Sequence, residues 1–177
     1  KISTFLCNFA LMKNEVESYS SYPIIKEIIK QVTKDGEKLN IKDLVGSSFA
    51  LIGAAVRNTT REFNHLFILP DKEQAAYFAN DLEELFDEVE EDYTKKEVMF
   101  YPSTNKKPYS YDSTENANII LRLETLNRIN NGEHLMVVTY PEAIAEKVVS
   151  KKLLENNSTT IKKGDEVITS GMDNIFF

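Results

Sequence analysis

The sequence predicts an α/β fold in which a parallel sheet carries helices on both faces. Short apolar runs of strand length alternate with longer stretches whose apolar residues recur at helical spacing. Parallel strands joined by helical crossovers are the usual outcome of such alternation. Hydrophobic residues make up 42% of the 177 residues and charged residues 28%. One domain with a sizeable core, or one domain with the start of another, is therefore expected.

Four apolar runs are predicted to be strands of this sheet. Turn residues bound them, and they are too short for typical helices. The run at 65–69 reads His-Leu-Phe-Ile-Leu, a composition typical of a parallel strand that is buried on both faces. The four predicted strands span residues 39–45, 65–69, 97–101 and 134–140.

Three helices are predicted in the first half of the chain. The first begins at Pro23, whose fixed φ suits a first turn, and ends near residues 35–36. The second, at 49–56, is small or apolar on almost every side, as in a helix buried against a sheet. The third is capped by Asp71, with Gln74 three residues later. The residues predicted to form the apolar faces of the first and third helices are Ile24, Ile25, Ile28, Ile29, Val32, Ala75, Ala79, Leu82 and Phe86.

Two more helices are predicted in the second half. The fourth follows a long polar loop and ends at an Asn-Gly pair, residues 131–132. On it, Arg122 and Glu124 are expected to face solvent or to pair with neighbours on the same helix. The fifth begins at Pro141 and is predicted to run to about Ser150. The apolar stripe predicted for the fourth helix consists of Ile119, Ile120, Leu123, Leu126 and Ile129.

Composition and charge argue against several classes of function. A net charge of −7 opposes strong autonomous DNA binding, which relies on Lys and Arg gathered on one face. The single cysteine, Cys7, excludes an internal disulfide or a multi-cysteine metal site and fits a reducing cytoplasm. His65 and His134 are expected to be structural. No apolar stretch approaches the roughly 20 residues that cross a bilayer, so no membrane association is expected.

Three regions are expected along the chain. Residues 1–20 are expected to form an N-terminal tail, or sequence upstream of a true start at Met12, because their short apolar run is interrupted by Asn8 and lacks the cleavage pattern of a signal peptide. Residues 21–154 form the α/β subdomain. Residues 155–177 contain a linker, an extended segment and a turn, and are expected to open a second small α/β subdomain. Because the chain stops on two phenylalanines, we expect it to be a piece of a larger protein.

The most informative motif is a predicted strand–turn–helix in the place of a phosphate-binding loop. A working loop surrounds phosphates with backbone N–H groups, adds a lysine for the β and γ charges, and adds a Ser or Thr for Mg²⁺. Aligned with Gly-Ser-Gly-Lys-Thr, the residues Gly46, Ser47, Ser48, Phe49 and Ala50 put a phenylalanine at the lysine and an alanine at the metal hydroxyl. The expected topology is thus that of a P-loop NTPase or helicase with a degenerate loop. No catalytic residue, cofactor or metal is expected, and a weak anion interaction at the helix N-terminus is the alternative to a plain turn.

Two further clusters of polar residues have a functional and a plain interpretation. Lys106, Lys107, Tyr109 and Tyr111 combine the charges and rings that hold single-stranded nucleic acid, or they form an exposed loop without a ligand. The acidic stretch at 83–92 is expected to be a solvated helix face and the loop beyond it, with metal binding as the alternative.

Four stretches of the chain form an ordered set of motifs. They are Val45-Gly-Ser-Ser-Phe-Ala-Leu-Ile52, Leu66-Phe-Ile-Leu-Pro-Asp71 with its helix, Phe100-Tyr-Pro-Ser103 with Asn118-Ile-Ile-Leu-Arg-Leu-Glu-Thr-Leu126, and Leu135-Met-Val-Val-Thr-Tyr-Pro-Glu-Ala-Ile144. Taken together, they resemble the N-terminal region of bacterial transcription-repair coupling factor, which is itself similar to the excision-repair protein UvrB. Their order and spacing across residues 21–167 carry the resemblance. The loop at 101–109 departs from the family's usual "FP…ETLPY" motif.

The resemblance implies that this chain has a non-catalytic role. In that family the whole protein is an ATP-driven DNA translocase that releases stalled RNA polymerase and recruits UvrA for nucleotide excision repair. ATP and Mg²⁺ belong to its motor domains, and its UvrB-like region does no ATP chemistry. The implied partners are UvrA and RNA polymerase for the whole protein, and its other domains for this part. The family's arginine-bearing strand that meets UvrA has no match before Phe177, so no UvrA-contact residue is assigned.

Two other functions stay open from the residues alone. The expected topology also suits a nucleotide- or small-molecule-binding domain of a helicase-like ATPase. Phe49, Ala50 and the lack of an Asp-Glu pair after an apolar strand oppose that function. A small-molecule enzyme on a doubly wound sheet would bind its substrate beyond the strand ends, but the sequence has no G-x-G-x-x-G motif.

Overall fold

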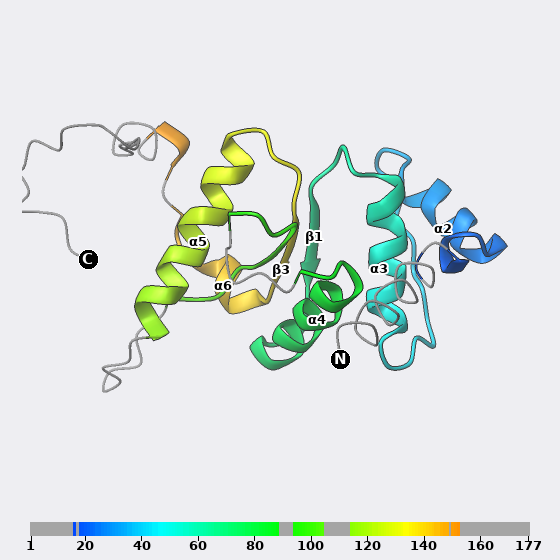
Figure 1. Ribbon diagram of the computed structural model, residues 1–177, viewed down its shortest axis with the longest axis horizontal. Helices are drawn as coiled ribbons and strands as arrows, with labels where there is room; N and C mark the ends of the chain where they lie inside the picture. The colour runs from blue at the N-terminus through cyan, green and yellow to red at the C-terminus, as the bar shows by residue number, and fades with distance from the viewer. Residues whose placement is uncertain (1–15, 17, 89–93, 105–113, 149, 153–177) are drawn as a thin grey trace, which may run out of the picture. The chain divides into compact units, whose positions relative to one another are not determined.

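A computed structural model describes residues 16, 18–88, 94–104, 114–148 and 150–152. It confirms an α/β fold with a small parallel sheet (Figure 1). The central strand is β3, and the order across the sheet is β1-β3-β2. In the register of the sheet, His65 and Val98 both lie beside Met136. The strands are β1 (His65–Ile68), β2 (Val98–Phe100) and β3 (Met136–Thr139).

The chain divides into two compact units, residues 1–147 and residues 148–177, and the named helices and strands all lie in the first. Among the described helices, none is both long enough and apolar enough to cross a bilayer. The predicted subdomain at 155–177 and most of the predicted tail at 1–20 lie outside the described residues. The helices are α2 (Pro23–Val32), α3 (Ser48–Thr59), α4 (Lys72–Leu85), α5 (Thr114–Asn130) and α6 (Pro141–Ala145).

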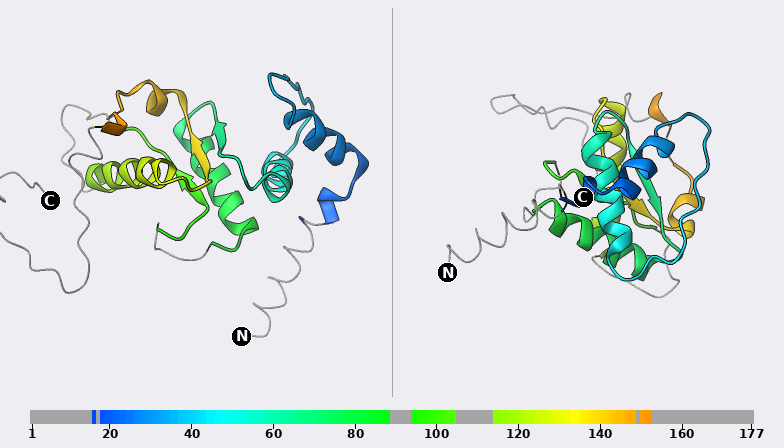
Figure 2. Two further views of the ribbon diagram at one scale, coloured as in Figure 1. Left: turned by 90° about the horizontal axis from the view of Figure 1, so that it is seen from above. Right: turned by 90° about the vertical axis from the view of Figure 1, so that its right-hand side faces the viewer.

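Helices α2 and α3 pack against each other through a small apolar cluster of their own (Figure 2). α2 begins at Pro23, as predicted, and ends at Val32. Gly36 lies in the turn beyond it with a φ of +74°, a conformation that glycine adopts without steric cost. Only one face of α2 is covered, so Ile24 and Val32 stay exposed. The buried residues of the cluster are Ile25, Ile28, Ile29, Ile52 and Ala55.

The predicted strand at 39–45 is wrong. This segment is exposed along its whole length, and Val45 is 82% exposed. A strand needs a neighbouring strand for its backbone hydrogen bonds, and the described sheet ends at β1. The segment instead links α2 to α3, which pack against each other, so its apolar side chains remain on the surface.

The two faces of the sheet are covered by different helices. Successive residues of a strand point to opposite faces, so Phe67 and Met99 lie on opposite faces in this register. Phe67 contacts Phe78 of α4, and a Cβ added at Gly53 of α3 would lie 3.1 Å from its ring. On the other face, Arg128 of α5 contacts the sulfur of Met99. α3 and α4 therefore cover one face, and α5 covers the other.

The prediction that β1 is buried on both faces is wrong. Leu66 is 60% exposed and Ile68 is 55% exposed. Both point to the α5 face of the sheet, where α5 packs over β2 at the opposite edge. β1 is an edge strand, so it lies beyond the cover that α5 provides.

The main core lies between the sheet and α3, α4 and α5. The predicted cap of α4 is confirmed, because the Asp71 carboxylate accepts a hydrogen bond from the Gln74 N–H at 2.8 Å. The predicted face of α4 is also confirmed, since Ala75, Ala79 and Leu82 are buried and Phe86 packs against the core. The buried core residues of the strands and of the positions that directly flank them are Val98, Met99, Tyr101, Leu135, Met136, Val137, Val138, Tyr140 and Leu69.

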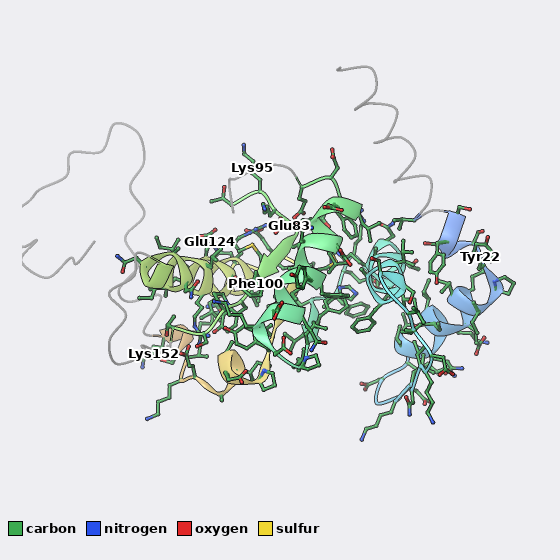
Figure 3. The ribbon with its side chains drawn as sticks, turned by 90° about the horizontal axis from the view of Figure 1, so that it is seen from below. Tyr22, Glu83, Lys95, Phe100, Glu124 and Lys152 are labelled. Atoms are coloured by element: carbon green, nitrogen blue, oxygen red, sulfur yellow. The ribbon has the colours of Figure 1, made fainter. Side chains whose placement is uncertain are left out.

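The predicted apolar stripe of α5 is only partly right. Leu126 and Ile129 pack against the core, but Ile119, Ile120 and Leu123 are exposed. The buried face instead carries three polar residues at a spacing of three, which are Arg122, Thr125 and Arg128. The expectation that Arg122 faces solvent or pairs with a neighbour on its own helix is therefore wrong, because it is buried and pairs with Glu146. Glu124, which is labelled in Figure 3, is half-buried.

Candidate functional site

Residues 46–50, predicted to be a degenerate phosphate loop, lie toward the carboxyl end of the sheet, and we call them the degenerate loop. Arg57, in the last turn of α3, donates a hydrogen bond to the His134 carbonyl at 2.8 Å, just before β3 begins. The last turn of α3 therefore lies at the amino ends of the strands. Because α3 rises about 1.5 Å per residue, its first residues lie toward the opposite end. That is the end where open α/β sheets bind their ligands.

The turn and the helix of the predicted motif are present, but the strand is not. Gly46 has a φ of +58°, which suits glycine. The turn closes on itself, because the Ser48 N–H donates to the Val45 carbonyl at 3.3 Å and the Ser48 hydroxyl accepts from the Val45 N–H at 3.0 Å. Two polar groups that could face a phosphate are therefore engaged inside the turn.

Phe49, at the position of the lysine, is a packing residue. Its ring is 41% exposed and lies against Phe78 of α4, with 4.9 Å between the ring centroids. Phe78 in turn contacts Phe67 of β1 at 5.1 Å. We call Phe49, Phe67 and Phe78 the aromatic set. Phe49 therefore packs the start of α3 against α4, and Phe78 continues this contact to β1 of the sheet.

Ala50, at the position of the metal-binding hydroxyl, points into the core and is 1% exposed. A methyl group cannot coordinate Mg²⁺, and its burial leaves no room for a hydrated ion. Among the described residues, no group of three or more His, Cys, Asp and Glu side chains is arranged to hold a metal.

The start of α4, at the same end of the sheet, already holds a carboxylate. Asp71 accepts hydrogen bonds from the N–H and the side-chain amide of Gln74, at 2.8 and 2.7 Å. These bonds lower the pKa of Asp71, the backbone bond most, so the carboxylate stays ionised. A phosphate at this helix N-terminus would meet a negative charge instead of free N–H donors.

The chain's own side chains also fill the carboxyl ends of β2 and β3. Arg122 donates hydrogen bonds to the Pro102 and Ala143 carbonyls, at 2.8 and 2.9 Å, and pairs with Glu146 at 3.1 Å. Its guanidinium lies 4.2 Å from the centre of the Tyr101 ring. The polar groups at this part of the edge are thus satisfied within the protein.

A second arginine, Arg57, forms hydrogen bonds at the opposite end of the sheet, where the strands begin. Arg57 is 4% exposed and donates to the carbonyls of Arg61, Phe63 and His134, and to the Glu97 carboxylate. In the sequence, Arg57 is the only charged residue of α3, and this was the signal that could have predicted its burial.

Arg128 is bound in a similar way on the last turns of α5. It donates to the Lys96 carbonyl and pairs with Glu133 at 2.8 Å. The spacing of Arg122, Thr125 and Arg128 matches a helix face, but sequence reasoning assigned that face to the neighbouring apolar residues.

Of the two polar clusters predicted from the sequence, the structure describes only part of the acidic stretch at 83–92. Lys106, Lys107, Tyr109 and Tyr111 lie outside the described residues, so the nucleic-acid patch stays a prediction. Within the acidic stretch, Glu83 of α4, which is labelled in Figure 3, pairs with Lys96 at 2.8 Å, two residues before β2 begins. The Glu88 carboxylate accepts hydrogen bonds from the backbone N–H groups of Glu97 and Val98. These two acidic residues hold β2 in place.

A pocket of about 530 Å³ lies away from the phosphate loop, between the end of α2 and the start of β1. His65 lies in its wall, and its Nε2 is 2.8 Å from the Thr60 hydroxyl. The Nδ1 atom is buried and has no hydrogen-bond partner among the described residues. The pocket is lined by residues 32–37, Val56, Thr60, Phe63, Asn64 and His65.

The environment of His65 predicts a loss of stability in mild acid. Burial, and then the nearby charge of Arg57, lower the pKa of His65 from its ordinary value of 6.5. The unfolded chain therefore takes up a proton at a higher pH than the folded protein does. The free energy of unfolding should be highest above pH 6.5 and should fall as the pH drops from there toward the lowered pKa.

Urea unfolding at a series of pH values between 7.5 and 5 measures this effect. A His65→Asn variant should show a flatter profile over this range. Equal profiles for wild type and the His65 variant would count against this account.

No protein-family model, curated protein or solved structure matches this chain.

Proposed function

We propose that the chain is a non-catalytic interaction module, and that its parent protein is a transcription-repair coupling factor. The first part rests on the two positions of the degenerate loop where a working phosphate loop has its lysine and its Mg²⁺-binding hydroxyl. Phe49 packs on Phe78, and Ala50 is buried. Neither position offers a cation or a hydroxyl to a nucleoside triphosphate, and the start of α4 is capped by its own carboxylate.

The second part of the proposal rests on the sequence resemblance. The stretches that resemble the UvrB-like region of the coupling factor occur in order along the chain. In such a parent, this module would contact the other domains of the same chain, while UvrA and RNA polymerase would bind the whole protein. ATP and Mg²⁺ would bind only in its motor domains. The coding sequence downstream of Phe177 should then contain an arginine-bearing strand and a motor with an intact phosphate loop.

Calorimetric titration with Mg-ATP tests the first part, and no saturable heat is expected. A Phe49→Lys variant should also fail to bind, because a single cation does not restore the missing strand, the metal hydroxyl or the free N–H donors. Phe49 is partly exposed, so the lysine can reach water and the variant should fold. A thermal melt checks that it does.

The alternative, a nucleotide-binding half of a helicase-like ATPase, predicts the opposite result. Saturable Mg-ATP binding by the wild-type chain, or ATP turnover stimulated by DNA, would establish that alternative. In a pull-down, we expect the chain alone to retain negligible UvrA, and clear retention would contradict that expectation.

A further inference from the structure

The outer side of β1, which we call the free edge, carries backbone groups without a partner among the described residues. The N–H groups of His65 and Leu69 donate to carbonyls in β3 or directly before it, both at 2.9 Å. Alternate residues of a strand direct their backbone groups to opposite sides, so those of Leu66 and Ile68 point away from β3. In the described part of the chain, no residue forms a hydrogen bond with these outward groups. Such an edge is a template for another strand.

The other edge of the sheet, at β2, is closed by a side chain. The Glu97 carbonyl accepts a hydrogen bond from Met136 of β3, so the next residue, Val98, directs its N–H outward. That N–H donates to the Glu88 carboxylate at 3.0 Å. The carboxylate thus takes the place that the carbonyl of an incoming strand would need. The free edge of β1 is therefore the better site for an added strand.

The side chains along the free edge favour an apolar strand. Leu66 and Ile68 are both more than half exposed, and both point to the face that α5 leaves uncovered at β1. Side chains of adjacent strands that share a face contact each other. A strand beside β1 would therefore cover both residues if it carried apolar side chains at alternate positions.

The pocket beside His65 extends this site at the amino end of β1. α2 lies on the side of β1 away from β3 (Figure 1), and the pocket of about 530 Å³ lies between the end of α2 and the start of β1. One end of a strand on the free edge would therefore reach it. The charged residues of its wall are Lys34, Asp35 and Glu37, and neither carboxylate forms an ion pair with a described residue. This excess of negative charge favours a basic side chain in the pocket.

We propose that the free edge and this pocket bind an extended segment of a partner protein, with apolar residues at alternate positions and a Lys or Arg at the end that reaches the pocket. The segment adds a strand to the sheet through backbone hydrogen bonds to Leu66 and Ile68. A second copy of this chain fits less well, because two chains of net charge −7 repel each other. The inference rests on the first part of the function proposed above and names the kind of partner that the interaction module takes.

The probe that tests this is a synthetic peptide of alternating valine and threonine with an arginine at each end, so that either strand direction brings an arginine to the pocket. Titration of the labelled peptide, followed by fluorescence polarisation, should give saturable binding. Hydrogen exchange of the Leu66 and Ile68 amides should slow by about tenfold or more in the complex, because both N–H groups gain a carbonyl partner. The same peptide with methylated backbone nitrogens cannot donate hydrogen bonds and should bind about tenfold more weakly or less.

A double variant of the free edge, Leu66→Lys with Ile68→Lys, should weaken peptide binding by about tenfold or more, because lysines on an edge strand oppose pairing with another strand. Both positions are more than half exposed, so the variant should fold, and a thermal melt checks that it does. The matched control is Ile119→Lys with Ile120→Lys, which adds the same charge at exposed apolar positions of α5. It should leave binding unchanged.

The pocket is tested by Glu37→Gln, which should weaken peptide binding by roughly threefold. Glu142→Gln removes an exposed carboxylate of α6 outside the pocket and should have no effect. Equal effects of these two changes would overturn the role of the pocket.

The proposal as a whole would be overturned if the folded wild-type chain did not bind the peptide, or if the folded variant with lysines at 66 and 68 bound it equally well. A dimer of the chain that these two lysines abolish would also overturn it, because a second copy would then occupy the free edge. Failure of the peptide to bind leaves the Mg-ATP titration unaffected. The two experiments therefore separate failure of this inference from failure of the non-catalytic assignment.

Discussion

Replacing Arg57 with methionine is expected to lower the free energy of unfolding by about 3 to 5 kcal/mol, one of the two largest effects that we predict. Arg57 is 4% exposed, and three backbone carbonyls depend on its guanidinium for a hydrogen bond. Two of them belong to the link between α3 and β1, and the third is at His134, just before β3. Methionine fills much of the same space, so the loss would come from the unsatisfied carbonyls and the Glu97 carboxylate.

The control for this prediction is Arg61→Met. Arg61 pairs with the same Glu97 carboxylate, at 3.3 Å, but its side chain is 57% exposed. An exposed ion pair contributes little, so the change should be below about 0.5 kcal/mol. Urea unfolding followed by circular dichroism measures both variants. Similar losses for the two would show that the shared ion pair matters more than the buried carbonyls.

Replacing Phe78 with alanine is expected to cost about 3 to 5 kcal/mol as well. Phe78 is 6% exposed and is the central ring of the aromatic set. Its removal would leave a cavity between Phe49 of α3 and Phe67 of β1, which both lie about 5 Å from it by ring centroid. Gly53 packs against the edge of the same ring, so the cavity could not be filled by a neighbouring side chain on that side.

Tyr77→Ala is the matched control, because Tyr77 is the preceding residue of α4 and is 67% exposed. Its loss should change the free energy of unfolding by less than about 0.5 kcal/mol. The comparison also bears on the degenerate loop. If Phe78→Ala were as mild as Tyr77→Ala, the aromatic set would not anchor the start of α3, and Phe49 would need another explanation.

Local pattern was sufficient for much of the fold. The alternation of apolar runs predicted the parallel pairing of β1, β2 and β3, and the spacing of Asp71 and Gln74 predicted the cap of α4. The same level of reasoning located the turn at Gly46 and the helix that follows it. These features depend on the periodicity of apolar residues and on hydrogen bonds between residues close in the sequence, so they can be predicted from the sequence alone.

Local pattern failed where long-range partners determine burial. The run at 39–45 has the composition of a strand, but no strand lies beside it to bond its backbone. The apolar spacing of α5 predicted its buried face, but part of that face is exposed, and Arg122 and Arg128 are buried instead. An arginine can be buried only where carbonyls and carboxylates are present to accept its hydrogen bonds. For Arg122 these come from Pro102, Ala143 and Glu146.

By itself, the sequence determined the α/β class, the cap of α4 and the absence of a lysine and a hydroxyl from positions 49 and 50 of the degenerate loop. Only the tertiary structure decided that Phe49 packs on α4, that three arginines join distant segments, and that α6 stops at Ala145. The physical reason is the same in each case. A residue's chemistry is a property of the residue, but its hydrogen-bond partners are supplied by segments that only the folded chain brings together.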